Sequence, residues 1–124
     1  MPRPILDPDL RTFAEALAAR GIAFVHFVEG NTGGARDLTG FDFVAAKKTL
    51  TKANVAYIAN NKYDRTLALH AIAHGAADAV AFGVPFIANP DLPERLRLDA
   101  PLNPAHPKTF YGPGAEGYTD YPTL

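Results

Sequence analysis

Three short and nearly continuous apolar runs alternate with helical patterns along this chain, and this alternation restricts the fold more than any other feature. The runs lie at 22–28 (IAFVHFV), 55–59 (VAYIA) and 77–82 (ADAVAF). Continuous apolar character is typical of strands buried on both faces of a parallel sheet. Strands that alternate with helices indicate right-handed βαβ units. The sequence therefore predicts an α/β fold with three parallel strands.

Apolar residues at helical spacing predict helices at 10–20, 41–50 and 65–74, and a short fourth helix with Pro90 just inside it. We expect the inner faces of these helices to include Phe13, Val44 and Ile72. From Asp99 onward no period is sustained, which predicts an irregular C-terminal tail. The loop at 29–40 is long for a compact domain, and long loops are often functional.

Composition and charge exclude several classes of protein. The formal net charge of the 124 residues is −1, with no basic stripe, which argues against nucleic acid as a partner. The absence of cysteine excludes disulfides and thiolate chemistry. Residues 1–10 (MPRPILDPDL) contain no apolar core of the length expected for a signal peptide, and no apolar run reaches the length expected for a membrane span. We therefore expect a soluble cytoplasmic protein with no membrane partner.

An open sheet of three parallel strands has two edges, and edges of apolar sequence promote aggregation unless they are covered. The unit is thus expected to be incomplete or to be completed by a partner. In α/β proteins, ligands lie outside the carboxyl ends of the strands, which here are 26–30, 59–63 and 83–86. Backbone N–H groups there can hold a phosphate. Gly83 would let a phosphate approach the backbone, although a tight turn alone would also require glycine.

Two segments carry a family resemblance: AFGVPFIANPDLP, which begins at Ala81, and the tail TFYGPGAEGYTDYP, which begins at Thr109. Both resemble the C-terminal end of the old yellow enzymes, which are FMN-dependent ene-reductases built on a (β/α)₈ TIM barrel. The resemblance implies that residues 1–124 are one C-terminal segment of such a barrel, containing barrel strands six to eight. The barrel would be incomplete, because a whole one needs about 200 residues or more.

The resemblance also implies site residues. The FMN phosphate would be held by Asn60, Asn61, Lys62, Gly83 and Val84. Many members of the family have arginine where this chain has Val84, and a glycine-bearing segment around Asn60. Asparagine tolerates a positive φ, so the turn is retained. Without the arginine we expect weaker phosphate binding, because a neutral site lacks a charge-assisted hydrogen bond.

Tyr111 matches the family's tyrosine in the substrate pocket, although a tail aromatic packed on the helices would also explain it. His26 lies within an apolar run. We expect it to be a hydrogen-bonded core residue, with a place beneath the flavin ring as the alternative. His70 and His74 are four residues apart on one helix, but no third ligand is in register, so no metal site is expected.

Family members polarise the substrate with residues from the first half of the barrel, and none of these has a counterpart here. No catalytic residue is therefore assigned. The resemblance implies the C-terminal part of an NADH- or NADPH-dependent reductase of activated alkenes or nitro compounds. The isolated chain is expected to be inactive. The alternatives are a non-catalytic module that binds FMN or phosphate, a chain that pairs with a separate N-terminal half, or a partial barrel that associates with a second copy.

Overall fold

The computed structural model describes residues 7–30, 34–36 and 41–124. The predicted loop at 29–40 is therefore described only at 29–30 and 34–36, and its other residues lie outside the described part. The chain divides into two compact units, residues 1–81 and 82–124. Among the described residues, no helix is both long enough and apolar enough to cross a membrane.

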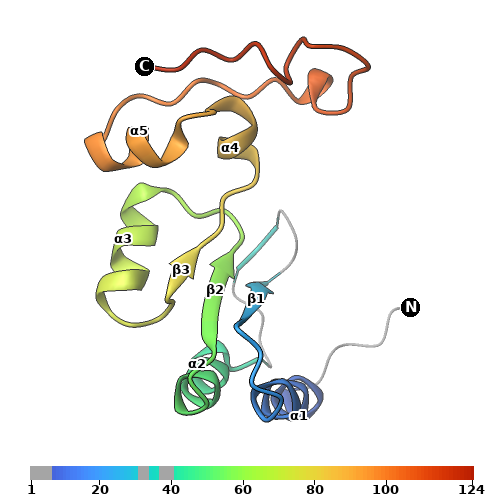
Figure 1. Ribbon diagram of the computed structural model, residues 1–124, viewed down its shortest axis with the longest axis vertical. Coiled ribbons are helices and arrows are strands. Elements are labelled where there is room, and N and C mark those ends of the chain that lie inside the picture. Colours follow the sequence, from blue (N-terminus) through green and yellow to red (C-terminus); the bar gives the residue numbers. More distant parts are fainter. Residues whose placement is uncertain (1–6, 31–33, 37–40) are drawn as a thin grey trace. The chain divides into compact units, whose positions relative to one another are not determined.

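The first unit contains a three-stranded parallel sheet, as predicted, in the order β1-β2-β3 (Figure 1). Its elements, in chain order, are α1 (Asp7–Ala18), β1 (Phe24–Val28), α2 (Phe43–Lys52), β2 (Ala56–Asn60), α3 (Arg65–Ala73) and β3 (Ala79–Val80). All three predicted strands and all three predicted helices of this unit are present.

Aspartates cap the starts of α2 and α3; α3 begins at Arg65, as predicted, whereas α1 and α2 begin away from their predicted positions. α2 begins two residues later than expected because the Asp42 carboxylate caps it, accepting a hydrogen bond from the N–H of Ala45 at 2.9 Å. Asp64 caps α3 in the same way through the N–H of Leu67. α1 begins three residues earlier than predicted, at Asp7.

β3 is much shorter than the predicted strand at 77–82. The reason lies at Asp78, whose carboxylate accepts the N–H of Tyr57 at 2.8 Å while its own N–H donates to the Tyr57 carbonyl oxygen. The Asp78 carboxylate thus accepts the Tyr57 N–H, which in a longer strand would donate to a backbone carbonyl oxygen. β3 therefore starts only at Ala79. The hydrogen bond from Tyr57, together with the nearby Lys47 ammonium, lowers the pKa of Asp78.

The expectation that residues 22–28 are buried on both faces is wrong. On one face of β1, Phe27 is buried against Tyr57 of β2, with the two rings stacked 4.8 Å apart. On the opposite face, Phe24 is 55% exposed, and His26 and Val28 are also exposed. His26 is therefore not a core residue in this chain. The apolar side chains of Phe24 and Val28 on this face are therefore not buried by the first unit.

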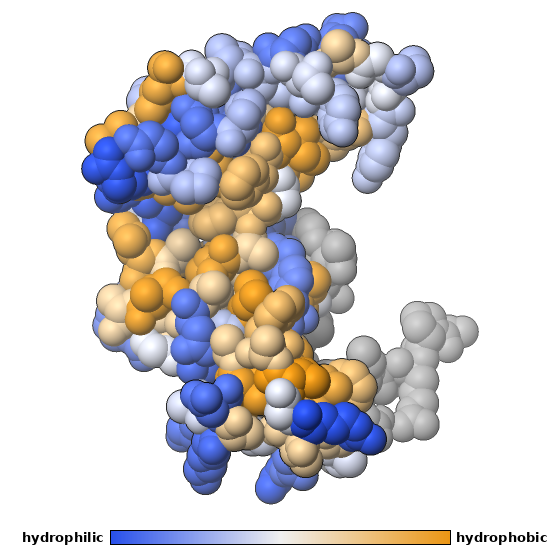
Figure 2. Space-filling model, viewed as in Figure 1, coloured by the Kyte–Doolittle hydropathy of each residue, from blue (hydrophilic) through white to orange (hydrophobic). Residues whose placement is uncertain are grey.

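The inner faces of the helices are built from small residues. Ala14 of α1, Ala46 of α2 and Ala71 of α3 are buried, with Leu50 as the large exception. The larger residues Phe13, Val44 and Ile72, expected to face inward, are instead about half exposed or more. Apolar residues accordingly gather at the surface of the first unit (Figure 2).

The second unit consists of two short helices, α4 (Val84–Ala88) and α5 (Leu92–Leu98), and a tail with one 3₁₀ turn, η1 (Pro107–Thr109). The predicted position of Pro90 just inside a single helix is wrong. Pro90 lies in the turn between α4 and α5, and Pro85 and Pro93 occupy the first turns of the two helices. The predicted irregular tail is confirmed.

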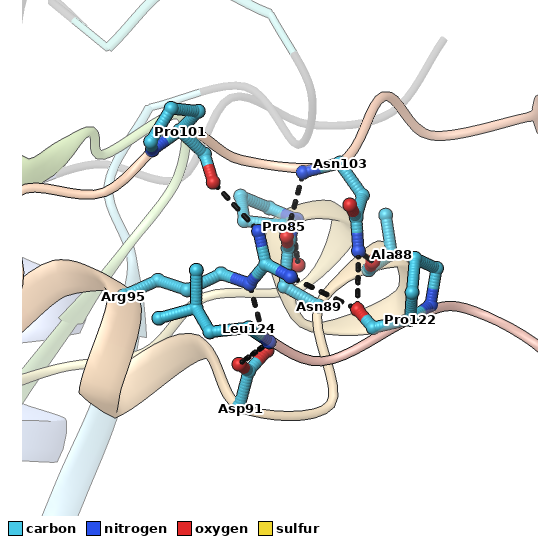
Figure 3. Close-up of polar contacts among 9 residues, drawn as sticks. All are labelled: Pro85, Ala88, Asn89, Asp91, Arg95, Pro101, Asn103, Pro122 and Leu124. Carbon is cyan, nitrogen blue, oxygen red and sulfur yellow. Dashed lines mark hydrogen bonds and ion pairs between the residues drawn. The ribbon is translucent and has the colours of Figure 1, made fainter.

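The buried guanidinium of Arg95 attaches the tail to α5 (Figure 3). Its Nε donates to Asp91 Oδ1 at 2.7 Å, and its two terminal nitrogens donate to the main-chain oxygens of Pro101 (2.7 Å) and Pro122 (2.9 Å). The other Asp91 oxygen accepts the N–H of Leu124 at 2.8 Å. One ion pair thus fixes both ends of a tail that has almost no regular structure of its own.

Two asparagines complete this network (Figure 3). Asn89 is fully buried and donates to the Pro85 carbonyl oxygen, while its own side-chain oxygen accepts the N–H of Asn103. The Asn103 amide donates to the carbonyl oxygens of Ala88 and Pro122. Satisfied side-chain networks of this kind specify one conformation where packing alone does not.

Replacing Arg95 with alanine should release the tail. The Pro101 carbonyl oxygen would lose its Arg95 donor and the Pro122 oxygen would keep only the Asn103 amide, at a cost of about 0.5–1.5 kcal/mol for each hydrogen bond lost. Limited proteolysis should then cut the tail of Arg95→Ala faster than that of the wild type. Arg97, an exposed residue paired with Glu94, provides the control, and Arg97→Ala should leave the cleavage rate nearly unchanged. Equal rates for both variants would contradict this role of Arg95.

Acid should release the C-terminal end through Asp91. The hydrogen bond from Arg95, and then that from the Leu124 N–H, lower the pKa of Asp91 below its ordinary value of 3.8. Because the folded state favours the ionised form, the contribution is complete above that value and is lost as the pH falls through the lower folded pKa. The Leu124 amide resonance should follow this titration, and Asp91→Asn should abolish it. An unchanged titration in Asp91→Asn would refute the assignment.

Candidate functional site

The three predicted site residues of the first unit lie in one turn, at the carboxyl end of β2. Asn60 is the last residue of the strand, Asn61 is buried beside it, and Lys62 is exposed. Asn61 and Lys62 have φ angles of 108° and 53°, which side chains rarely allow. Each such residue costs roughly 1–3 kcal/mol and persists only where its surroundings enforce it.

The turn presents unpaired backbone donors. The Asn61 N–H donates to the side-chain oxygen of Asn60 at 2.7 Å. The next two N–H groups, of Lys62 and Tyr63, have no hydrogen-bond partner within the described part of the chain. Two successive free N–H groups beside an exposed ammonium suit an anion. At the start of α3, the Leu67 N–H donates to the Asp64 cap and is not available to a ligand.

Glu29, which directly follows β1, lies at the centre of the polar contacts beside this turn. Its carboxylate accepts hydrogen bonds from the hydroxyls of Tyr57 (2.7 Å) and Tyr63 (2.5 Å) and from Arg36 (3.3 Å). Its main-chain oxygen accepts the side-chain N–H of Asn61 at 2.7 Å. We call Glu29, Arg36, Tyr57 and Tyr63 the Glu29 cluster.

Both tyrosines of the cluster are held in their protonated form. Burial, and then the hydrogen bond to Glu29, raise the pKa of Tyr63 to about 12. The same two causes raise the pKa of Tyr57 still further above its ordinary value. Near neutral pH both hydroxyls therefore act as hydrogen-bond donors to the carboxylate and are unsuited to proton transfer.

Arg36 reaches the cluster because Gly30 lets two backbone segments meet. Gly30 has a φ of 84°, and a Cβ there would lie 2.1 Å from the Ala35 oxygen. This approach places the Arg36 guanidinium over the Tyr63 ring, 4.2 Å from its centroid, where it offsets the charge of Glu29.

The other two predicted contact residues, Gly83 and Val84, lie at the start of α4 in the second unit. Gly83 is the N-cap of α4 and has no side-chain capping bond. Its φ is −93°, and a Cβ at this position would meet no protein atom within 4 Å. Packing within the protein therefore does not account for a glycine here.

Tyr111 follows η1 in the tail and is 99% exposed, so it does not pack on the helices. The rings of His70 and His74 stack 3.9 Å apart at the end of α3. The described residues contain no group of three or more histidine, aspartate or glutamate side chains that could hold a metal ion.

The Glu29 cluster was not predicted from the sequence. Its members are separated by up to 34 residues, and only the fold brings them together. One signal was available: Glu29 is the first charged residue after the run IAFVHFV and so had to lie at a strand end.

Comparison with known proteins supports the resemblance seen in the sequence. No family model matches the chain. The 12-oxophytodienoate reductase 2 of Arabidopsis thaliana is 39% identical over 115 residues, which are 89% of this chain and 29% of that protein. The chain therefore spans less than a third of the length of this relative.

Solved structures agree. Morphinone reductase, in a complex with tetrahydroNAD, superposes with a TM-score of 0.77 and 39% identity, over 95% of this chain and 30% of the other. The old yellow enzyme from Trypanosoma cruzi gives a TM-score of 0.84 and 34% identity, over 95% and 30% of the two chains. In sequence and in fold, the chain is therefore similar to the C-terminal part of the old yellow enzymes.

Proposed function

We propose that this chain supplies FMN-phosphate contacts of an old yellow enzyme-type ene-reductase whose catalytic half is not contained in residues 1–124. The three strands would be strands six to eight of a TIM barrel, so that the 124 residues form one partial-barrel segment. The substrates of the complete enzyme would be activated alkenes or nitro compounds, and the reaction would take place in the cytoplasm.

The turn after β2 is the observation on which this proposal rests. It offers the free N–H groups of Lys62 and Tyr63 and the exposed Lys62 ammonium. These donors suit a phosphate monoester, which is the charged end of FMN. Asn60 and Asn61 would shape the turn, because their side chains bond to the backbone within it and beside it.

Gly83 and Val84 supply independent support from the second unit. The open space beside Gly83 is what a backbone segment needs when a ligand approaches closely. Val84 contributes no charge, so we expect phosphate affinity to depend on Lys62 and on backbone donors. FMN bound there would supply the redox chemistry of the enzyme. This chain's own contribution would be to hold its phosphate.

We base the proposed reductant and substrate pocket on the resemblance to the old yellow enzymes. Morphinone reductase forms a complex with tetrahydroNAD, and we propose NADH or NADPH as the reductant of the complete enzyme. Tyr111, fully exposed in this chain, would line the substrate pocket. No residue of the chain is proposed as catalytic.

A second candidate function is self-association, or pairing with a separately encoded N-terminal half. The observation that favours it is the uncovered face of β1, which exposes Phe24 and Val28 at the edge of the sheet. Such an edge and face are normally covered. Size-exclusion chromatography would distinguish a stable dimer without flavin from a monomer that retains FMN.

Gly83→Ala should weaken FMN binding by about tenfold, or 1.4 kcal/mol. The reason is that the added methyl group would occupy the space proposed for the phosphate, while meeting no protein atom. Visible absorbance during titration with FMN measures the affinity. Riboflavin lacks the phosphate and should bind the wild type and Gly83→Ala equally. Gly114→Ala is the matched control, because a Cβ there also meets nothing within 4 Å. Equal FMN affinity in Gly83→Ala and Gly114→Ala would remove Gly83 from the site.

The isolated chain should show negligible NAD(P)H-dependent reduction of an activated alkene, even when FMN is present in excess. The groups that polarise the substrate usually supply a large share of the barrier lowering, and no such group is assigned here. Oxidation of NADPH in the presence of cyclohexenone provides the assay. Turnover at a rate typical of enzymes, about 1 per second or more, would show that the chain carries a catalytic centre.

A further inference from the structure

The turn that follows β2 has an unfavourable backbone conformation, and contacts with residues outside the turn hold it there. Asn61 and Lys62 both have positive φ, and neither is glycine. Without external contacts the backbone would relax toward commoner angles, which would reorient the N–H groups of Lys62 and Tyr63. Whatever holds the turn therefore controls its ability to bind an anion.

Glu29 makes three separate contacts with this turn. Its N–H donates to the Asn60 carbonyl oxygen at 3.0 Å, continuing the pairing of β1 with β2. Its carbonyl oxygen accepts the side-chain N–H of Asn61, and its carboxylate accepts the hydroxyl of Tyr63. Exposed Lys62 thus lies between two buried residues that are both bonded to Glu29.

The carboxylate itself is held in place from the side of the sheet. Tyr57, which is fully buried in β2, donates to one of its oxygens, and Arg36 approaches the other. Both carboxylate oxygens are thus occupied by protein donors, and the Arg36 charge offsets theirs. This arrangement suits a residue that positions other groups better than one that binds a ligand directly.

We propose that Glu29 is a positioning residue that sets the turn at Asn60–Tyr63 in the conformation required to bind a phosphate monoester. The inference rests on the proposed function for the identity of the anion. It assigns to Glu29 a role that is distinct from overall stability: loss of its carboxylate should change how the turn binds phosphate more than how tightly the chain binds an unphosphorylated flavin.

The test compares FMN with riboflavin in the full chain and in three variants. Glu29→Gln keeps the size of the side chain and removes its charge, and Tyr63→Phe removes one hydrogen bond and keeps the ring. Glu116→Gln, at an exposed glutamate in the tail, is the control. The preference for FMN over riboflavin should fall about tenfold in the first two variants and stay unchanged in the control.

A measurement without any flavin separates this inference from the proposed function. The amide resonances of Asn61, Lys62 and Tyr63 should shift in Glu29→Gln, and their response to added inorganic phosphate should weaken. If the wild type does not prefer FMN to riboflavin, the proposed function fails, and the amide shifts alone decide whether Glu29 positions the turn.

Two results would overturn the inference. One is amide resonances of the turn that are the same in Glu29→Gln and in the wild type. The other is a wild-type preference for FMN that persists in Glu29→Gln and Tyr63→Phe, even if both variants melt at lower temperature. The second result would mean that the Glu29 cluster stabilises the first unit without affecting the phosphate turn.

Discussion

The parallel pairing of β1 with β2 is the contact on which the rest of the first unit depends. Its register places Phe27 level with Ala59 and Val28 level with Asn60. Glu29 and Asn61 directly follow these two strands. They are then close enough for the Asn61 side chain to donate a hydrogen bond to the Glu29 carbonyl oxygen. A shift of one residue would point the Glu29 carboxylate to the opposite face, away from Tyr57. The candidate site is therefore a direct product of strand register.

Much of this fold could be predicted from the sequence, because local patterns determine it. Continuous apolar runs predicted the three parallel strands, and an aspartate directly precedes both α2 and α3. The predictions that failed depended on distant partners. β3 is short because Asp78 bonds to Tyr57, 21 residues away. The uncovered face of β1 could not be foreseen, since a sequence records which residues suit burial and not whether a covering layer is present.

The candidate site, too, was predicted where local patterns determine it and not where it depends on distant partners. The turn after β2 was predicted because strand ends collect ligands in α/β folds. The Glu29 cluster was not, because its members come from three parts of the chain, and no local pattern links a glutamate to tyrosines 28 and 34 residues later. The Arg95 network escaped prediction for a similar reason. Arginine in a short amphipathic helix usually indicates a solvated face, whereas here it is buried by a tail of no regular structure.

The positions of the Glu29 cluster residues along the chain limit where crossovers can be placed when proteins are recombined. All its members fall between residues 29 and 63, within the first unit. A chimera of this chain and a similar protein, with a crossover inside this interval, would join a carboxylate from one parent to tyrosines from the other. Any mismatch would leave a partly buried charge without its donors. Crossovers placed before β1 or after the turn inherit the whole cluster from one parent, so these positions are the natural boundaries of an exchangeable block.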